Sequence, residues 1–151
     1  MKRIVITAFF VLIFGISVSA QEKTDVKDEA AAQMLLGRHQ VSLQWISWDY
    51  FGVATVTKKG DLFWLNGYQK GRGRNKSDYL QISGRILSIS ATEFKFRGEI
   101  ITSVGHINDG LSCSRVGTST FKITGTRRYW RLQQMDNPCD HVTDYVDIYF
   151  R

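Results

Sequence analysis

The densest group of positive charges lies in a glycine-containing segment at residues 70–76. It carries four cations within seven residues, which are Lys70, Arg72, Arg74 and Lys76. Clustered guanidinium and ammonium groups bind phosphate or carboxylate, so the segment is a candidate site for an anionic glycan or lipid. Its glycines do not form a nucleotide-binding loop, because no Gly-Lys-Ser/Thr follows a strand here. The alternative interpretation is a hairpin loop whose charges are simply solvated.

A second candidate surface mixes arginines with aromatic residues in the segment Thr126–Gln134. Alternate side chains of a strand point to opposite faces, which groups Arg127, Tyr129 and Arg131 on one side. Tyrosine rings stack on flat partners and guanidinium groups form paired hydrogen bonds, so this side suits sugar or protein binding. The alternative is that Trp130 and its neighbours on the other side face the core, while the first set is only solvated.

Four aromatic residues fall within the seven residues from Trp45 to Phe51. We expect Trp45 in the core. Trp48 and Tyr50 fall at a strand end or turn, where the rim of a ligand pocket would be built. The alternative is that both side chains cap the end of the folded domain.

Metal binding and catalysis have weaker support. The segment Met135–Asp147 is rich in acids and could hold Ca²⁺, but its spacing matches no calcium-binding loop. The three histidines lack the spacing of a zinc site, so we predict no metal and no cofactor. A hydrolase with His106 or His141 as base would need a nucleophile, and no Gly-x-Ser-x-Gly motif supplies one.

Residues 1–20 have the features of a secretory signal peptide. Lys2 and Arg3 precede the uncharged stretch Ile4–Ile16, and Ala20 is a small residue that a signal peptidase accepts. The stretch is shorter than the ~20 apolar residues that span a bilayer as a helix. We therefore predict cleavage and export, to the periplasm or out of the cell.

Cys113 and Cys139 are the only cysteines. Because the compartment outside the cytoplasm is oxidising, we predict that they form a disulfide. A catalytic cysteine with a histidine base is the alternative, and an unpaired thiol rarely survives there beside a second one.

Residues 21–37 are predicted to form one short helix that precedes the main domain. The helical stretch is Glu22–Leu36, with Thr24 or Asp25 as N-cap and Gly37 at the position of a C-terminal glycine.

The main domain, residues 38–151, has apolar residues that alternate with a period of two. About eight strands are predicted, around residues 41–45, 53–57, 62–65, 79–89, 93–104, 118–124, 127–134 and 144–150. No link is long enough for a crossover helix, so the strands should be antiparallel. The simple order favours an all-β up-and-down barrel over a β-sandwich. The short strands and the missing aromatic girdle argue against an outer-membrane barrel.

Across Gly37–Arg151 this pattern resembles the small calycin or lipocalin-like β-barrels. Lipocalins usually carry Gly-x-Trp at the first strand, where this chain has Gly37-Arg38-His39 and its first tryptophan in the domain is Trp45. The resemblance implies a barrel around a small apolar ligand, and a late arginine, here Arg131, packed on the first-strand tryptophan. Because the motif differs, no binding residue is carried over from the family.

Three functional hypotheses follow. The first is an exported, non-enzymatic binding protein, with a small apolar ligand in a cavity near Trp45, Trp64 and Phe96 or an anionic glycan or lipid outside the barrel. The second is a secreted protein–protein interaction module or enzyme inhibitor, and the third is a small hydrolase. The composition, with 20 basic and 14 acidic residues, 1 Pro and 2 Cys, excludes collagen-like, disordered and disulfide-dense classes. Export makes nucleic acid an improbable partner for the basic surface.

Overall fold

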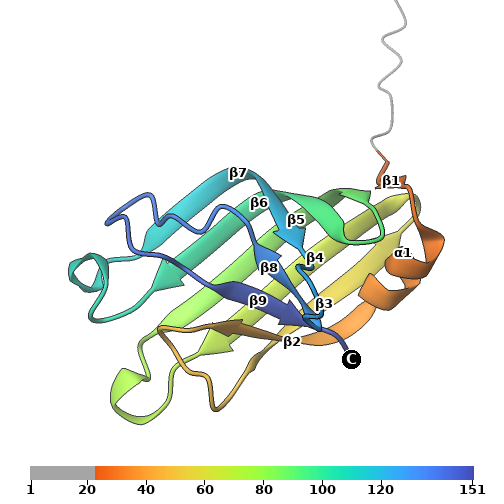
Figure 1. The fold of residues 1–151 in the computed structure, drawn as a ribbon. Coiled ribbons are helices and arrows are strands. Elements are labelled where there is room, and N and C mark those ends of the chain that lie inside the picture. Colours follow the sequence, from red (N-terminus) through yellow and green to blue (C-terminus); the bar gives the residue numbers. More distant parts are fainter. Residues whose placement is uncertain (1–22) are drawn as a thin grey trace, which may run out of the picture.

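A closed antiparallel barrel makes up most of the protein in the computed structural model, which describes residues 23–151 (Figure 1). Its eight strands are β2 (Gly37–Leu43), β3 (Gly52–Lys59), β4 (Leu62–Lys70), β5 (Tyr79–Ile89), β6 (Glu93–Ser103), β7 (Cys113–Lys122), β8 (Tyr129–Leu132) and β9 (Val146–Tyr149). Each strand pairs with the next one along the chain, and β2 pairs with β9 to close the ring. The prediction of an all-β, up-and-down barrel is confirmed. The predicted signal peptide lies outside the described residues.

A short strand, where helix was predicted, precedes the barrel. β1 (Asp25–Val26) pairs in parallel with the end of β5. The Thr24 hydroxyl donates to the Ile86 carbonyl at 2.6 Å and accepts from the Phe63 backbone N–H at 3.0 Å. The predicted helix start and its cap are therefore wrong, because these residues complete the sheet at the ends of β4 and β5.

The helix itself, α1 (Glu29–Leu35), begins later than predicted and lies at one end of the barrel (Figure 1). Asp28 is its N-cap, and the carboxylate accepts from the Ala31 N–H at 2.8 Å. The side chain of Leu35 is fully buried in the core. Gly37 follows with a φ of 103°, which only glycine adopts readily, as predicted for the end of the helix. No helix within residues 23–151 is long and apolar enough to cross a membrane.

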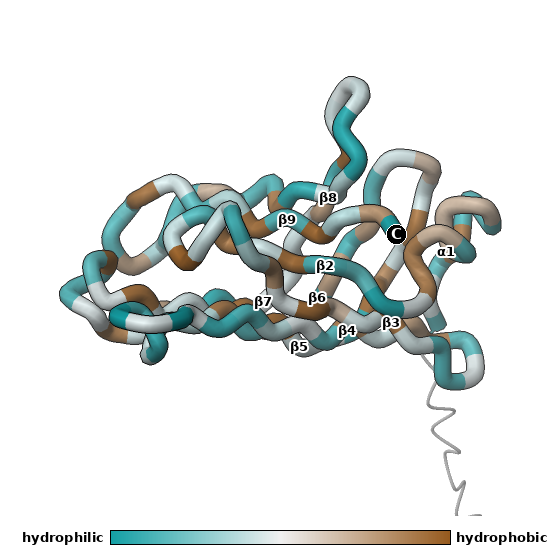
Figure 2. The backbone as a smooth tube through the Cα atoms, turned by 90° about the horizontal axis from the view of Figure 1, so that it is seen from below, coloured by the Kyte–Doolittle hydropathy of each residue, from teal (hydrophilic) through white to brown (hydrophobic). Residues whose placement is uncertain are grey.

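Apolar side chains from every barrel strand pack together inside the ring. Hydrophobic and hydrophilic positions alternate along the strands, as Figure 2 shows. Trp130 is buried in this core, as the alternative interpretation of its strand predicted, and Phe96, which was expected to line a cavity, is buried there too. Trp64 is not, because its neighbours Phe63 and Leu65 point inward and leave it on the outer surface with 36% of its area exposed. The prediction that Trp64 lines an interior cavity is therefore wrong.

A row of glycines crosses three neighbouring strands. Gly84 on β5 is in register with Gly98 on β6, which is in register with Gly117 on β7. A Cβ on Gly84 would lie 2.6 Å from the Gly98 Cα and 2.7 Å from the Phe96 ring. Glycine therefore lets the two strands and this ring approach closely, at a place where the wall of the barrel must bend.

Four connections form the end of the barrel opposite α1, which we call the loop end. They comprise residues 44–51, 71–78, 104–112 and 133–145. Asn108–Gly110 lies in the third of these as a short turn in which all three residues have positive φ. A tight turn at residues 60–61 joins β3 to β4 at the other end.

Candidate binding face

The predicted mixture of arginines and tyrosines lies on the outside of β8 and β9. Tyr129 and Arg131 alternate with Trp130 and Leu132, which are 2% and 0% exposed in the core. We call this surface the aromatic–arginine face, and it consists of Arg127, Tyr129, Arg131, Tyr145 and Tyr149. Strand alternation therefore places Tyr129 and Arg131 together, as predicted. Arg127 precedes β8, outside the strand predicted to hold it, and its guanidinium lies 5.8 Å from the Tyr129 ring centre.

Arg131 is held rigidly at the centre of the face. Its Nε and Nη2 donate to the two carboxylate oxygens of Asp147, each at 2.7 Å. The guanidinium carbon lies 4.2 Å from the ring centre of Tyr145 and 5.2 Å from that of Tyr129. The hydrogen bond with Asp147 raises the pKa of Arg131 against the effect of burial. Arg131 therefore packs on these tyrosines and not on Trp45, which corrects what the lipocalin resemblance implied.

Tyr149 extends the face toward β2. Its ring centre lies 5.4 Å from that of Tyr129 and 5.1 Å from that of Phe51. Its hydroxyl is 3.1 Å from the Ser42 hydroxyl. Burial raises the pKa of Tyr149, with a smaller opposing effect of the Ser42 hydrogen bond. The sequence reading did not single out Tyr149, although the alternation Asp147–Tyr149 in β9 puts both side chains on the outer face.

A groove of about 580 Å³ adjoins the face over β2. Phe51, which contacts Tyr149, forms one wall, and Arg38 and Arg151 bring two cations to the groove. His39 at its floor is 3% exposed, with its ring nitrogens 2.9 and 2.8 Å from the backbone carbonyl oxygens of Tyr149 and of the last helical residue. The groove thus presents aromatic and cationic side chains above a histidine that two hydrogen bonds hold in place.

The other predicted site residues belong to the loop end. The Arg72 guanidinium lies 4.3 Å from the Tyr50 ring centre, and the Arg72 backbone N–H donates to the Tyr50 hydroxyl at 3.0 Å. Arg74 is exposed in the same loop, and Trp48 is 53% exposed. The structure therefore joins Tyr50 with Arg72, in a different contact network from that of Arg131.

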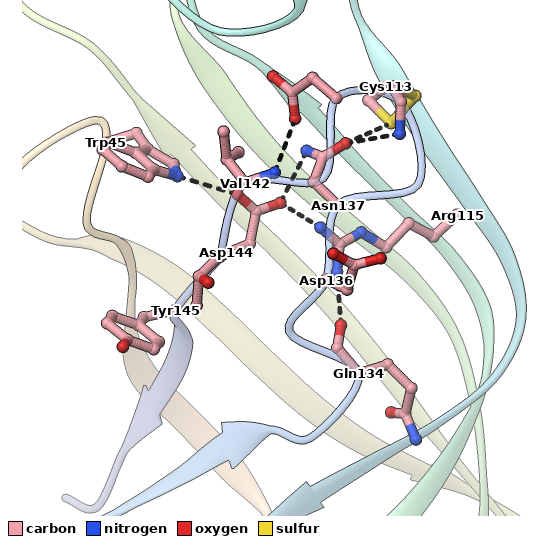
Figure 3. Close-up of polar contacts among 12 residues, drawn as sticks. Trp45, Cys113, Arg115, Gln134, Asp136, Asn137, Val142, Asp144 and Tyr145 are labelled. Carbon is pink, nitrogen blue, oxygen red and sulfur yellow. Dashed lines mark hydrogen bonds and ion pairs between the residues drawn. A yellow bond between two sulfur atoms is a disulfide. The ribbon is translucent and has the colours of Figure 1, made fainter.

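A buried ion pair, which sequence reading missed, holds the loop end together (Figure 3). The Asp144 carboxylate pairs with Arg115 and also accepts from Trp45 Nε1 at 2.9 Å and from Asn137 Nδ2 at 3.0 Å. Burial lowers the pKa of Arg115 and raises that of Asp144, and their mutual attraction opposes both effects. Trp45 is thus half-buried against a carboxylate and does not line an apolar cavity.

The predicted disulfide closes the same end. Cys113 on β7 is bonded to Cys139 in the 133–145 loop, which confirms the pairing. The Cys139 N–H donates to Asn137 Oδ1 at 2.9 Å, so the disulfide and the ion pair share Asn137. The hollow beneath, between Trp45 and Cys113, has no room for a water molecule. This network therefore leaves no open cavity between Trp45 and the disulfide.

The histidines considered for catalysis lie in exposed positions. His141 Nδ1 is 3.2 Å from an Asp136 carboxylate oxygen, but the two side chains are 77% and 71% exposed. His106 is exposed, and its ring centre is 6.0 Å from that of Trp45. Among residues 23–151 no three His, Cys, Asp or Glu side chains gather as metal ligands would. The His–carboxylate pair therefore lies on the surface and not within a cavity.

The comparisons with known proteins give a family for this barrel. The chain matches the PM1083 family over residues 23–150. It belongs to this family. It is 41% identical over 155 residues to the "Uncharacterized protein PM1083" of Pasteurella multocida (strain Pm70), and the match covers 99% of each chain. No solved structure matches the chain. The resemblance to lipocalins is therefore one of barrel architecture, and the PM1083 family match brings no assigned activity.

Proposed function

We propose that this PM1083-family protein is an exported, non-enzymatic binding protein that holds an acidic glycan on its aromatic–arginine face. The observation that carries the proposal is the fixed position of Arg131 between Tyr129 and Tyr145. Because Asp147 occupies two donors of this guanidinium, Arg131 orients the tyrosine rings and is not the main anion receptor. The face thus offers pre-ordered rings, which lowers the entropy that binding would cost.

The surrounding cations match an acidic partner. Arg127 is exposed, and its guanidinium lies 5.8 Å from the Tyr129 ring centre. Arg38 and Arg151 line the groove on the other side of Phe51 and Tyr149. Apolar faces of sugar rings stack on tyrosine, and carboxylate or phosphate groups pair with guanidinium groups. A chain of acidic sugars would therefore satisfy both kinds of group along one surface.

A ligand outside the barrel agrees better with the packing than one inside. Phe96 and Trp130 belong to a continuous core, and the hollow between Trp45 and Cys113 has no room for a water molecule. Export is supported by the sequence of residues 1–20 and by the disulfide. An extracytoplasmic glycan, free or as the head group of a glycolipid, is a partner that such a protein would meet.

Isothermal titration calorimetry measures the affinity for an oligogalacturonate and tests the proposal. A neutral maltooligosaccharide of equal length is the ligand control. We expect Arg127→Gln and Tyr129→Ala to weaken binding about tenfold each, which corresponds to about 1.4 kcal/mol. Lys95→Gln, which removes an exposed charge on β6 that β7 separates from β8, is the matched control and should bind as the wild type does. Equal binding of the neutral sugar, or unchanged binding by both face variants, would refute the glycan site.

A protein partner is the second candidate function, because tyrosine and arginine are enriched in protein interfaces. Capture of one specific protein by the wild type, lost in Tyr129→Ala and not displaced by the oligogalacturonate, would favour this alternative. Binding of the protein to vesicles that display the acidic sugar, with the oligogalacturonate as competitor, would instead identify a glycolipid as the source of the glycan.

A further inference from the structure

Two loops of the loop end pack into one unit, which we call the basic corner. It consists of residues 44–51 and 71–78 with the adjoining end of β4. Besides the contact of Arg72 with the Tyr50 ring, Gln69 Nε2 donates to the Tyr50 carbonyl at 3.0 Å. Figure 1 shows the two loops beside each other at the end of the barrel opposite α1. The corner is therefore an ordered surface.

The charge of the basic corner is strongly positive. Its four cations are all exposed, and they are Lys70, Arg72, Arg74 and Lys76. Asp78 in the same loop is buried, and its carboxylate accepts from the Gly105 N–H at 3.0 Å. Asp49 is the one exposed acid of the corner. Four cations thus face solvent with a single opposing carboxylate.

Large aromatic side chains stand exposed beside these charges. Trp48 is 53% exposed and Tyr68 is 45% exposed. Tyr68 and Lys70 lie on the same outer side of β4, two residues apart. Tryptophan and tyrosine are enriched at the membrane–water interface, where the apolar ring is buried and the polar edge stays hydrated.

Two further acidic residues of the loop end lie on the side away from the basic corner. Asp136 and Asp140 belong to the 133–145 loop, which Figure 1 shows well separated from the 71–78 loop. Asp140 Oδ2 accepts from the Asn108 N–H at 2.8 Å, so this acid is held away from the basic corner. The two sides of the loop end therefore differ in charge, which favours one orientation toward a negative surface.

We propose that the basic corner docks the protein onto an anionic lipid bilayer. The four cations lie over the lipid phosphates, and the Trp48 ring enters the interfacial layer. Charge complementarity combined with a neighbouring exposed tryptophan distinguishes a bilayer from a soluble polyanion, which offers no apolar layer. The aromatic–arginine face takes no part in this contact, so the inference stands apart from the proposed glycan site.

Sedimentation with vesicles tests the docking. The protein, purified after export, is mixed with vesicles of phosphatidylcholine alone or of phosphatidylcholine with phosphatidylglycerol. We expect binding only to the anionic vesicles and its loss at high salt. Arg74→Gln combined with Lys76→Gln should weaken this binding about tenfold or more, since each basic residue near an anionic surface contributes to it. Both side chains are exposed to solvent, and circular dichroism verifies folding.

Trp48 has a matched control in Trp64, which is exposed on the wall of β4. We expect Trp48→Ala to weaken vesicle binding and to abolish a blue shift of tryptophan fluorescence, while Trp64→Ala changes neither. Equal binding to neutral vesicles, or wild-type binding by the charge variant, would overturn the proposal. Binding of heparin that depends on the cations, without any fluorescence shift on vesicles, would overturn it too and identify a soluble polyanion. Arg127→Gln, which tests the glycan site, should leave vesicle binding intact.

Discussion

The buried Arg115–Asp144 ion pair should make a large contribution to stability. Their side chains are 10% and 1% exposed, so either partner left alone is an uncompensated buried charge. Arg115→Met or Asp144→Leu alone should each lower the free energy of unfolding by about 3–5 kcal/mol. The double variant should cost clearly less than the two single losses together, because no charge then remains. Urea unfolding measures all three, and additive losses would contradict the pairing.

Ionisation of Tyr149 should make the stability of the protein depend on pH in the alkaline range. Burial raises its pKa above the ordinary value of 10.0, so folding favours the neutral phenol. This contribution is fully present below the pKa of the unfolded chain and is lost as the pH rises through the higher folded pKa. The stability advantage of the wild type over Tyr149→Phe should therefore shrink above about pH 10. Urea midpoints measured across this range check it, and a constant or growing advantage would refute it.

At the residue scale, sequence reading could assign positions along a strand but not contacts across the fold. Alternation placed Tyr129 and Arg131 on the outside, because that pattern is local. Arg115 and Asp144 are 29 residues apart, and their contact depends on how the 133–145 loop folds back. No local pattern encodes that path, so the ion pair was missed.

Among the elements, the glycine row makes β5 and β6 sensitive to a single methyl group. A Cβ on Gly98 would lie 2.2 Å from the Ser83 carbonyl oxygen and 2.6 Å from the Gly84 Cα. Gly98→Ala should therefore destabilise the barrel by about 3 kcal/mol, at the upper end of overpacking effects. Gly105→Ala is the control, since its Cβ would meet nothing closer than 3.5 Å. Thermal or urea unfolding compares the two, and equal stability would disprove the close approach.

The elements also show where local propensity loses to tertiary structure. The acidic, alanine-rich N-terminal segment predicted a helix from Glu22, and the helix begins at Glu29. Thr24 would cap a helix in isolation, but its hydroxyl bridges Ile86 and Phe63 in the barrel. The Thr24 hydroxyl pairs backbone groups at the ends of β4 and β5 that would otherwise be buried without a partner. This stabilises the protein more than one extra turn of a short helix would.

For the whole molecule, the period-two pattern and short connections were enough to predict the closed barrel. They could not predict whether its interior is open, because that depends on which side chains fill the centre. Trp64 illustrates the limit, since a shift of one position in a strand moves a ring from the core to the surface. The packed core and the closed hollow between Trp45 and Cys113 direct the search for a ligand to the outer surface.

The most direct test of the central claim is a nuclear magnetic resonance titration of the isotope-labelled protein with the oligogalacturonate. The outer-face account predicts that signals of Tyr129, Arg131 and Tyr149 shift first, while those of buried Phe96 and Leu65 stay in place. The contrary result is a set of shifts centred on the core residues, which would mean that the barrel opens to hold its ligand inside.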